Sequence, residues 1–277
     1  MTSHAPAAPL AGSAERALAR SLAAFAYKTY VVAELEIRRL KHDPTELITR
    51  AVQPALWLLI FGEVFTRVRA IPTGNVPYLD FMAPGILAQS VLFVAIFSGI
   101  ALIWERDLGV IHKLFVSPTP RAALVVGKAL SAGVRSFSQV VIVYTLAVVL
   151  GVQMNWHPLA LAGVAVAVLT GAACFGTLSL IIASLVRTRE RFMGIGQLLT
   201  MPLFFASNAI YPLAIMPTWL HVVARINPLS YQVDVLRALM IRSGGTAFGI
   251  GTDFVVLVSS TVILVAIAAR VYPRVVT

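Results

Sequence analysis

The feature that most limits the fold of this chain is a run of 51 residues, 136–186, without a single Asp, Glu, Lys or Arg. A helical membrane crossing needs roughly 20 mostly apolar residues to pass through about 30 Å of hydrocarbon. The run is therefore too long for one crossing. The turn-like sequence GVQMNWHP at 151–158 divides it into two, with Trp156 suited to the membrane interface.

The rest of the sequence has the same character. Hydrophobic residues make up 58% of the 277 positions and charged residues 12%, about half the charged content of a typical soluble domain. We therefore expect an all-α, polytopic membrane protein and not two soluble domains. The single cysteine, Cys174, excludes an intrachain disulfide and is interpreted as a small packing residue.

Six segments are long and apolar enough to cross a membrane. The predicted spans are about 47–66, 81–103, 130–151, 158–186, 192–210 and 250–270. Residues 1–16 form an Ala/Pro-rich tail that we expect to be disordered and that lacks a signal-peptide pattern. Residues 17–42 have apolar positions at helical spacing, which predicts an amphipathic helix in the membrane interface; a helix packed only on protein remains the alternative.

Basic residues predict the orientation of these spans. Sixteen of the 22 Lys and Arg residues fall on the side of the N-terminus, five fall on the other side, and Arg135 lies inside the third span. The positive-inside rule then places both termini in the cytoplasm and the chain in the cell (inner or plasma) membrane. Because the basic residues are spread over many loops, the net charge of +10 does not indicate a nucleic-acid partner.

The segment 104–121, WERDLGVIHKLFVSPTPR, interrupts the apolar sequence with five charged residues. Leu108, Ile111 and Phe115 recur at i, i+3 and i+7, which predicts a short amphipathic helix, and the sequence from Ser117 to Pro120 ends it. Apolar residues ringed by charge are typical of a docking surface. A loop helix that merely enters the lipid headgroups has the same pattern, so both interpretations stay open on physical grounds.

Two blocks of sequence resemble the ABC-2 type export permeases, the membrane subunits of ABC exporters related to daunorubicin-resistance permeases. The first block matches at Glu105, Arg106, Gly109, Leu114 to Val116, Ser117-Pro118 and Gly127-Lys128. The second, at 201–240, matches at Ser207, Tyr211-Pro212, Met216-Pro217, Asn227-Pro228, Tyr231, Asp234 and Arg237, with Asn208 in place of the family's common Gly. The resemblance covers about residues 20–272.

This resemblance implies one ABC-2 transmembrane domain at 17–277, in which 104–121 is a coupling segment that docks on a separate ABC ATPase subunit. The implied docking residues are Glu105, Arg106, Leu108, Gly109, Ile111, Phe115, Ser117, Pro118 and Arg121. It also implies short, partly re-entrant helices on the outer side before the last span, which involve Ser207, Tyr211, Pro212, Pro217, Asn227 and Pro228. A second permease, identical or homologous, would complete the pathway among the membrane lipids.

The sequence offers no catalytic motif. The pair Gly127-Lys128 is not a P-loop, because Ala122 stands at the position of the first Gly and Ala129 at that of the Ser or Thr. We therefore expect no cofactor in this chain, with ATP and Mg²⁺ bound by the partner subunit. The five His residues are scattered and form no metal-ligand or hydrolase pattern, so no catalytic residue and no metal site are predicted.

Polar residues inside the spans are the remaining candidates. Lys128, Ser131, Arg135 and Gln139 form a stripe on the third span that favours either a transport or gating role or a structural ion pair. Glu63, near the outer end of the first span, either lines the pathway or pairs with Arg67 one turn on. The aromatic residues Trp57, Phe61, Phe204 and Phe205 either stack on a sugar or are ordinary core and lipid-facing residues.

From these observations we expect the permease subunit of an ABC exporter. Its expected substrate is an amphipathic drug, lipid or glycan-type molecule, moved out of the cytoplasm with ATP hydrolysed by the partner. A membrane assembly or structural protein without transport is the alternative. A membrane enzyme acting on lipids is a third reading, which the lack of clustered catalytic groups disfavours.

Overall fold

The computed structural model describes residues 44–68, 71–74, 76–108, 121–186 and 188–271. The predicted tail, the predicted interfacial helix at 17–42 and residues 109–120 of the coupling segment lie outside the described residues. Within the described part the chain is helical, and its β pairing is limited to an isolated bridge between Met154 and Ile241. The expected all-α fold is confirmed.

The helices follow one another along the chain. In order they are α2 (Pro44–Leu56), the π-helix η1 (Trp57–Gly62), α3 (Glu63–Val68), α4 (Tyr78–Ser98), α5 (Ile100–Asp107), α7 (Arg121–Val149), α8 (Pro158–Leu185), α9 (Arg189–Phe205), the 3₁₀ turn η2 (Leu213–Ile215), α10 (Thr218–Ile226), α11 (Pro228–Met240) and α12 (Ile250–Val271).

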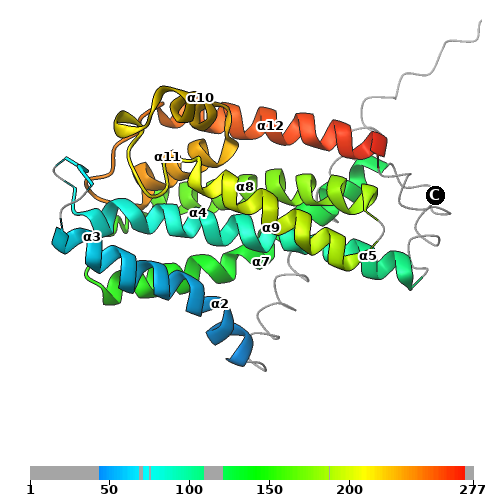
Figure 1. The fold of residues 1–277 in the computed structure, drawn as a ribbon, viewed down its shortest axis with the longest axis horizontal. Coiled ribbons are helices and arrows are strands. Elements are labelled where there is room, and N and C mark those ends of the chain that lie inside the picture. Colours follow the sequence, from blue (N-terminus) through cyan, green and yellow to red (C-terminus); the bar gives the residue numbers. More distant parts are fainter. Residues whose placement is uncertain (1–43, 69–70, 75, 109–120, 187, 272–277) are drawn as a thin grey trace, which may run out of the picture.

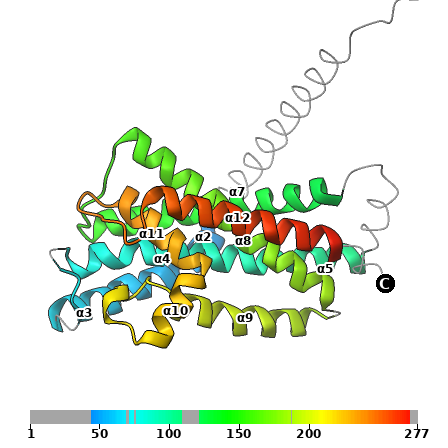
Figure 2. The ribbon, with the colours of Figure 1, turned by 90° about the horizontal axis from the view of Figure 1, so that it is seen from above.

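The long helices run side by side along the length of the molecule (Figure 1). Helix α4 occupies the middle, where every residue from Tyr78 to Leu92 is buried, as expected of a helix that is apolar on all faces. It packs on α7, α8, α9, α11 and η1, while α8 also packs on α12. Figure 2 shows α9 and α10 on one side of the bundle and α7 on the other.

Five apolar helical stretches are long enough to cross a membrane, which supports a multi-pass membrane protein. They are Ala51–Val68, Tyr78–Asp107, Val126–Val149, Pro158–Leu185 and Ile250–Val271. In the most apolar window of the second stretch, 67% of the residues are buried inside the chain, against 17% in the first and 11% in the last. The first and last helices therefore offer their apolar surface to lipid or to another protein chain.

The predicted span at 192–210 corresponds to α9, which has 17 residues and ends at Phe205. This is shorter than the roughly 20 residues of a typical crossing, so the count of six spans stays a prediction. Helix α7 begins at Arg121, earlier than the predicted span at 130–151, because the helix continues beyond the apolar part of its sequence.

The prolines between α9 and α11 divide the chain as expected. Pro212 precedes η2, Pro217 precedes α10, and Pro228 occupies the first turn of α11. A proline is tolerated at a helix start, where its missing N–H would have no partner in any case. The predicted break into short helices is confirmed, and their re-entrance into a membrane stays a prediction.

Candidate functional site

The predicted site residues that the structure describes gather at the two ends of the bundle. The end of α5 and the turn between α8 and α9 lie at one end, and α3, the start of α4 and α10 lie at the other (Figure 1). These ends are some 20 residues of helix apart, or about 30 Å at 1.5 Å per residue. We describe the α5 end first.

We call Trp104–Leu108 the coupling root, because these are the described residues at the start of the predicted coupling segment. Glu105 and Asp107 both lie in the last turn of α5 and both form ion pairs with other helices. The Glu105 Oε2 atom lies 2.5 Å from Nζ of Lys128 in α7. The Asp107 Oδ2 atom lies 2.7 Å from a terminal guanidinium nitrogen of Arg189 in α9.

Two further contacts hold the same turn. Arg106 donates a hydrogen bond of 3.1 Å to the carbonyl oxygen of Val186, just after α8. The guanidinium carbon of Arg189 lies 3.4 Å from the centre of the Trp104 ring, which is a cation–π contact. The coupling root is therefore attached to α7, to the residue that follows α8, and to α9.

Sequence reasoning singled out Lys128 but missed the pair formed by Asp107 and Arg189. Arg189 was interpreted only as one of the basic residues that set the orientation, and Asp107 was not singled out. The signal in the sequence was the group Arg187, Arg189 and Arg191 between two predicted spans. The positive-inside rule explains such a group equally well.

The remaining residues of the predicted docking set are described only in part. Leu108 ends the coupling root and is 72% exposed, consistent with an apolar residue available to a partner. Arg121 begins α7, but its side chain lies outside the description, as do Gly109, Ile111, Phe115, Ser117 and Pro118 altogether.

The polar stripe of α7 faces the coupling root. Lys128, Ser131 and Arg135 line a cavity of about 80 Å³ together with Glu105, and α8 closes it at Leu180. Arg135 donates a hydrogen bond of 3.5 Å to Ser131 one turn earlier. The fourth member, Gln139, is buried and lies beyond this cavity. The structure thus brings together three of the four stripe residues, with Lys128 in an ion pair.

Glu63 lies apart from this stripe, at the start of α3. Its carboxylate is 3.8 Å from Nε of Arg67 and both side chains are strongly exposed. This geometry corresponds to the Glu63–Arg67 pair, which was one of the two interpretations of Glu63 from the sequence; the other was a position in the pathway.

At the other end of the bundle, Asn227 joins α9 to α11. Its side-chain oxygen accepts from the backbone N–H of Leu229 at 3.0 Å and so caps α11, while its amide donates to the carbonyl of Leu203 at 2.7 Å. Ser207 is also buried, donating to the carbonyl of Phe204 at 2.7 Å and accepting from the N–H of Ala209 at 3.3 Å. These residues fix the backbone of the connection that follows α9, which we call the outer connection after its predicted position.

Tyr211 and Tyr78 hold the same connection from two sides. The hydroxyl of Tyr211 donates to the carbonyl of Phe205, and that of Tyr78 donates to the carbonyl of Ile210 at 3.1 Å. A side chain at Gly85 of α4 would collide with the backbone of Ala209, so the connection lies directly on α4. The close backbone approach occurs at Ala209, next to the Asn208 that replaces the family's usual Gly.

A group of buried charged residues at this end was not predicted as a site. The sequence placed Arg237 among the outer loop arginines, but the structure buries it to 7% exposure, because α11 packs inside the bundle. Its guanidinium donates to the carbonyl oxygens of Phe81 at 3.3 Å and Asn208 at 2.8 Å. The carboxyl groups of Asp234 and Asp253 are buried close to each other on α11 and α12.

The four aromatic residues that the sequence had singled out form one aromatic cluster, made of Trp57, Phe61, Phe204 and Phe205. The Trp57 ring centre lies 4.5 Å from Phe61, 5.5 Å from Phe204 and 6.3 Å from Phe205. Phe204 is buried, whereas Phe61 and Phe205 are exposed. The aromatic cluster therefore joins η1 to α9 and leaves Phe61 and Phe205 partly exposed at the surface.

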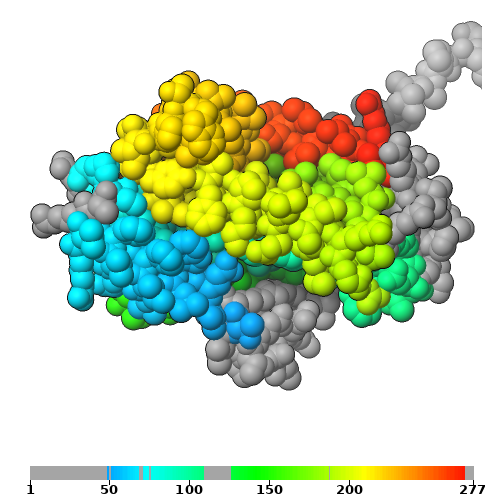
Figure 3. Space-filling view, viewed as in Figure 1, coloured from blue at the N-terminus to red at the C-terminus, as the bar shows by residue number. Residues whose placement is uncertain are grey.

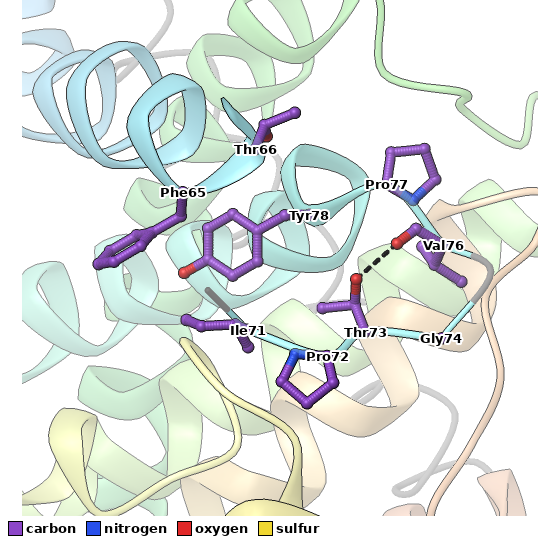
Figure 4. A pocket seen from close by; sticks show the side chains of 9 residues that line it. All are labelled: Phe65, Thr66, Ile71, Pro72, Thr73, Gly74, Val76, Pro77 and Tyr78. Carbon is purple, nitrogen blue, oxygen red and sulfur yellow. Dashed lines mark hydrogen bonds between the residues drawn. The ribbon is translucent and has the colours of Figure 1, made fainter. Parts of the chain in front are cut away.

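A pocket of about 470 Å³ opens beside this end of the bundle, between α3 and the start of α4 (Figure 4). Phe65 and Tyr78 form its apolar wall, and the loop that includes Pro72 and Thr73 forms its rim. The rim is held by a hydrogen bond of 2.6 Å from the Thr73 hydroxyl to the Val76 carbonyl.

Comparison with known protein families gives a match to the ABC-2 type transporter model over residues 27–241, which is well over half of the chain. This range contains the coupling root, the polar stripe, the aromatic cluster and most of the outer connection. It stops before α12.

Three relatives show how similar the chain is to other permease sequences. A protein of Cyanophora paradoxa described as the transport permease ycf38 is 30% identical over 221 residues, 79% of this chain and 76% of that one. The daunorubicin resistance ABC transporter permease protein DrrB1 of Streptomyces coeruleorubidus is 25% identical over 205 residues, 74% and 72% of the two chains. A protein of Escherichia coli K12 described as the multidrug ABC transporter permease YbhR is 26% identical over 175 residues, 61% and 45%.

Proposed function

Because the chain belongs to the ABC-2 type transporter family, we propose that it is the membrane-spanning permease subunit of an ABC exporter. It works with a separate ABC ATPase subunit, as permeases of this family do in general. The chain has no P-loop, so ATP and Mg²⁺ are bound by that partner. Two permeases, identical or homologous, enclose the pathway.

The observation that carries this proposal is the attachment of the coupling root to three helices. When ATP binding closes the ATPase subunits, they push on residues 104–121. The ion pairs Glu105–Lys128 and Asp107–Arg189 then transmit the movement to α7 and α9. The hydrogen bond from Arg106 to Val186 adds the end of α8. A loop helix that merely rests in lipid headgroups has no need of three such attachments.

The orientation follows from the basic residues. The coupling root and both termini lie in the cytoplasm, and the end with α10 and the pocket of Figure 4 faces outward. Helix α9 and residues 206–210 together form the fifth of the six crossings. Helices α10 and α11 are the partly re-entrant outer helices, which suits the burial of α11, because broken helix at membrane depth must be covered by protein or line a cavity.

We propose an amphipathic drug, lipid or glycan-type molecule as the substrate. The names of two relatives refer to daunorubicin and to multiple drugs, which favours a drug within this group. The aromatic cluster supports the same choice, since partly exposed aromatic rings at Phe61 and Phe205 can pack against planar or ring-shaped molecules. The polar cavity at Arg135 supplies a gating element on the path from the coupling root.

The proposal is tested by breaking and restoring one attachment of the coupling root. Glu105→Lys places two cations together, and we expect export per ATP hydrolysed to fall about fivefold, because a partly exposed ion pair contributes about 1 kcal/mol. The double variant Glu105→Lys with Lys128→Glu restores the pair and should recover most of the loss. The measurement uses the permease and its ATPase subunit co-reconstituted in vesicles, with daunorubicin as the transported probe.

Glu190→Lys is the matched control, since Glu190 is an exposed acid of α9 in no described ion pair. If Glu105→Lys behaves like this control in both ATP hydrolysis and export, the coupling role is wrong. If the ATPase subunit neither binds the permease nor is stimulated by it, a membrane assembly role without transport is favoured.

A further inference from the structure

An open groove lies where α8 ends and α9 begins, and shares Val186 with the contacts of the coupling root. Its volume is about 570 Å³, and its lining is apolar apart from one arginine. The lining residues are Leu185, Val186, Arg191, Gly194, Ile195 and Leu198. Helix α9 forms part of the front surface of the molecule in Figure 3.

The groove follows one face of α9. Arg191, Gly194, Ile195 and Leu198 are spaced i, i+3, i+4 and i+7, so they lie in one row along the helix. This row extends roughly 10 Å along the helix axis, which is 7 residues at 1.5 Å each. Leu198 is 71% exposed and Leu185, across the groove, is 56% exposed, so the described chain leaves the apolar row uncovered.

Gly194 makes the groove deep enough for an occupant. A side chain built at this position would meet no other atom within 4 Å, so the space above the glycine is empty. Glycine in a helix interior costs stability relative to alanine, and no tight contact in the described structure explains its presence here.

Arg191 supplies a positive charge at one end of the row. The acids of the neighbouring coupling root are already occupied, because Glu105 pairs with Lys128 and Asp107 pairs with Arg189. Within the described part of the chain, no carboxylate lies within ion-pair distance of the Arg191 guanidinium, which is exposed. An unpaired cation at the end of an apolar row matches the headgroup and acyl chain of a lipid.

We infer that this groove binds one anionic phospholipid, with the phosphate on Arg191 and an acyl chain along Gly194, Ile195 and Leu198. The arginine lies at the coupling-root end of the bundle, so the lipid comes from the leaflet at that end. Val186 belongs both to the groove and to the hydrogen bond from Arg106. A bound lipid therefore steadies the α8–α9 turn to which the coupling root is attached.

The headgroup part is tested by counting lipids bound to the purified full-length chain in native mass spectrometry. The probes are palmitoyl-oleoyl phosphatidylglycerol, which is anionic, and phosphatidylcholine with the same chains. We expect Arg191→Gln to weaken binding at the tightest phosphatidylglycerol site about fivefold, because one arginine near an anionic lipid surface contributes about a fivefold gain in affinity. Binding of phosphatidylcholine should stay unchanged. Arg270→Gln, at an exposed arginine near the end of α12, is the control and should change neither.

The acyl-chain part is tested by filling the groove. Gly194→Leu should lower the binding of both lipids at this site several-fold while the protein stays folded, because the new side chain enters empty space. Gly127→Leu is the matched control, since Gly127 is also an exposed helical glycine with no atom near its built side chain.

Unchanged phosphatidylglycerol binding in Arg191→Gln and Gly194→Leu would overturn the inference. A loss of self-association in Gly194→Leu without a loss of lipid would also overturn it, by identifying the groove as an interface between two copies. The measurement needs neither ATP nor the ATPase subunit, so its failure leaves the proposed transport function untouched.

Discussion

At the scale of single residues, Arg237 shows how a buried charge fixes the connection that follows α9. Its guanidinium donates to carbonyl oxygens of Phe81 in α4 and Asn208 in the outer connection. The guanidinium carbon also lies 3.8 Å from the centre of the Phe81 ring. One planar group therefore joins three segments. Its positive charge is balanced in part by Asp234, one turn earlier in α11. The Asp234 carboxylate in turn accepts hydrogen bonds from the backbone N–H groups of Ala247 and Phe248.

We expect Arg237→Lys to destabilise the protein by about 2 kcal/mol, because hydrogen bonds from a charged group each contribute about 1.5–3 kcal/mol and an ammonium cannot keep the planar geometry. Arg242→Lys, at an exposed arginine beyond α11, is the control and should be neutral. Thermal unfolding of the purified chain, followed by tryptophan fluorescence, measures both. Equal melting temperatures for the two variants would show that the contacts of Arg237 contribute nothing.

At the scale of elements, one arginine of α9 holds the coupling root, next to the buried apolar cluster that Phe192 of α9 shares with Leu102 and Ile103 of α5. Arg189 is the first residue of α9 and contacts both Trp104 and Asp107, at the two ends of the last turn of α5. Helix α9 makes few other contacts with α5, since it packs mainly on α4. Removal of this side chain should therefore loosen the end of α5 without unfolding the bundle.

Arg189→Gln tests this link by hydrogen exchange of the backbone amides of residues 100–108. Exchange should become about tenfold faster there, which corresponds to about 1.4 kcal/mol of lost local stability. Glu190→Gln, one residue away and exposed, should leave the exchange unchanged. Unaltered protection of α5 in Arg189→Gln would mean that α5 is held by its apolar contacts alone.

At the scale of the whole molecule, the number of crossings depends on α9. An even number of spans places both termini on one side of the membrane, whereas five spans place them on opposite sides. Helix α9 has 17 residues and runs beside α4 in the bundle. The buried, unreactive position of Cys174 makes cysteine labelling a suitable test, because the native thiol is shielded.

We expect Thr188→Cys to react with a membrane-impermeant maleimide only after the cells are permeabilised, and Thr218→Cys to react in intact cells. Both threonines are exposed and they flank α9 and the outer connection. The unsubstituted chain, with Cys174 alone, is the control and should stay unlabelled. Labelling of the two cysteines from the same side would contradict a membrane crossing at α9.

The sequence by itself determined the class of fold and the positions of its breaks. Apolar runs of about 20 residues can only be helices in a membrane or in a large core, since every backbone polar group must find a partner within the segment. Three prolines mark the starts of the short pieces after α9, with Pro212 before η2, Pro217 before α10 and Pro228 in the first turn of α11. Pro54, Pro84 and Pro202, in contrast, lie inside helices, so a proline alone does not fix a break. These conclusions rest on local chemistry, which a sequence states directly.

Only the tertiary structure decided which residues act on one another across the bundle. Glu105 and Lys128 are 23 residues apart, Asp107 and Arg189 are 82 apart, and Arg237 reaches the carbonyl of Phe81 at a separation of 156. Helical periodicity predicts the face of its own helix on which a residue lies. It does not predict which face of another helix lies opposite, because that depends on how all the side chains pack together. For the same reason the α8–α9 groove, made by two helix ends and an unfilled space at Gly194, has no signature in the sequence.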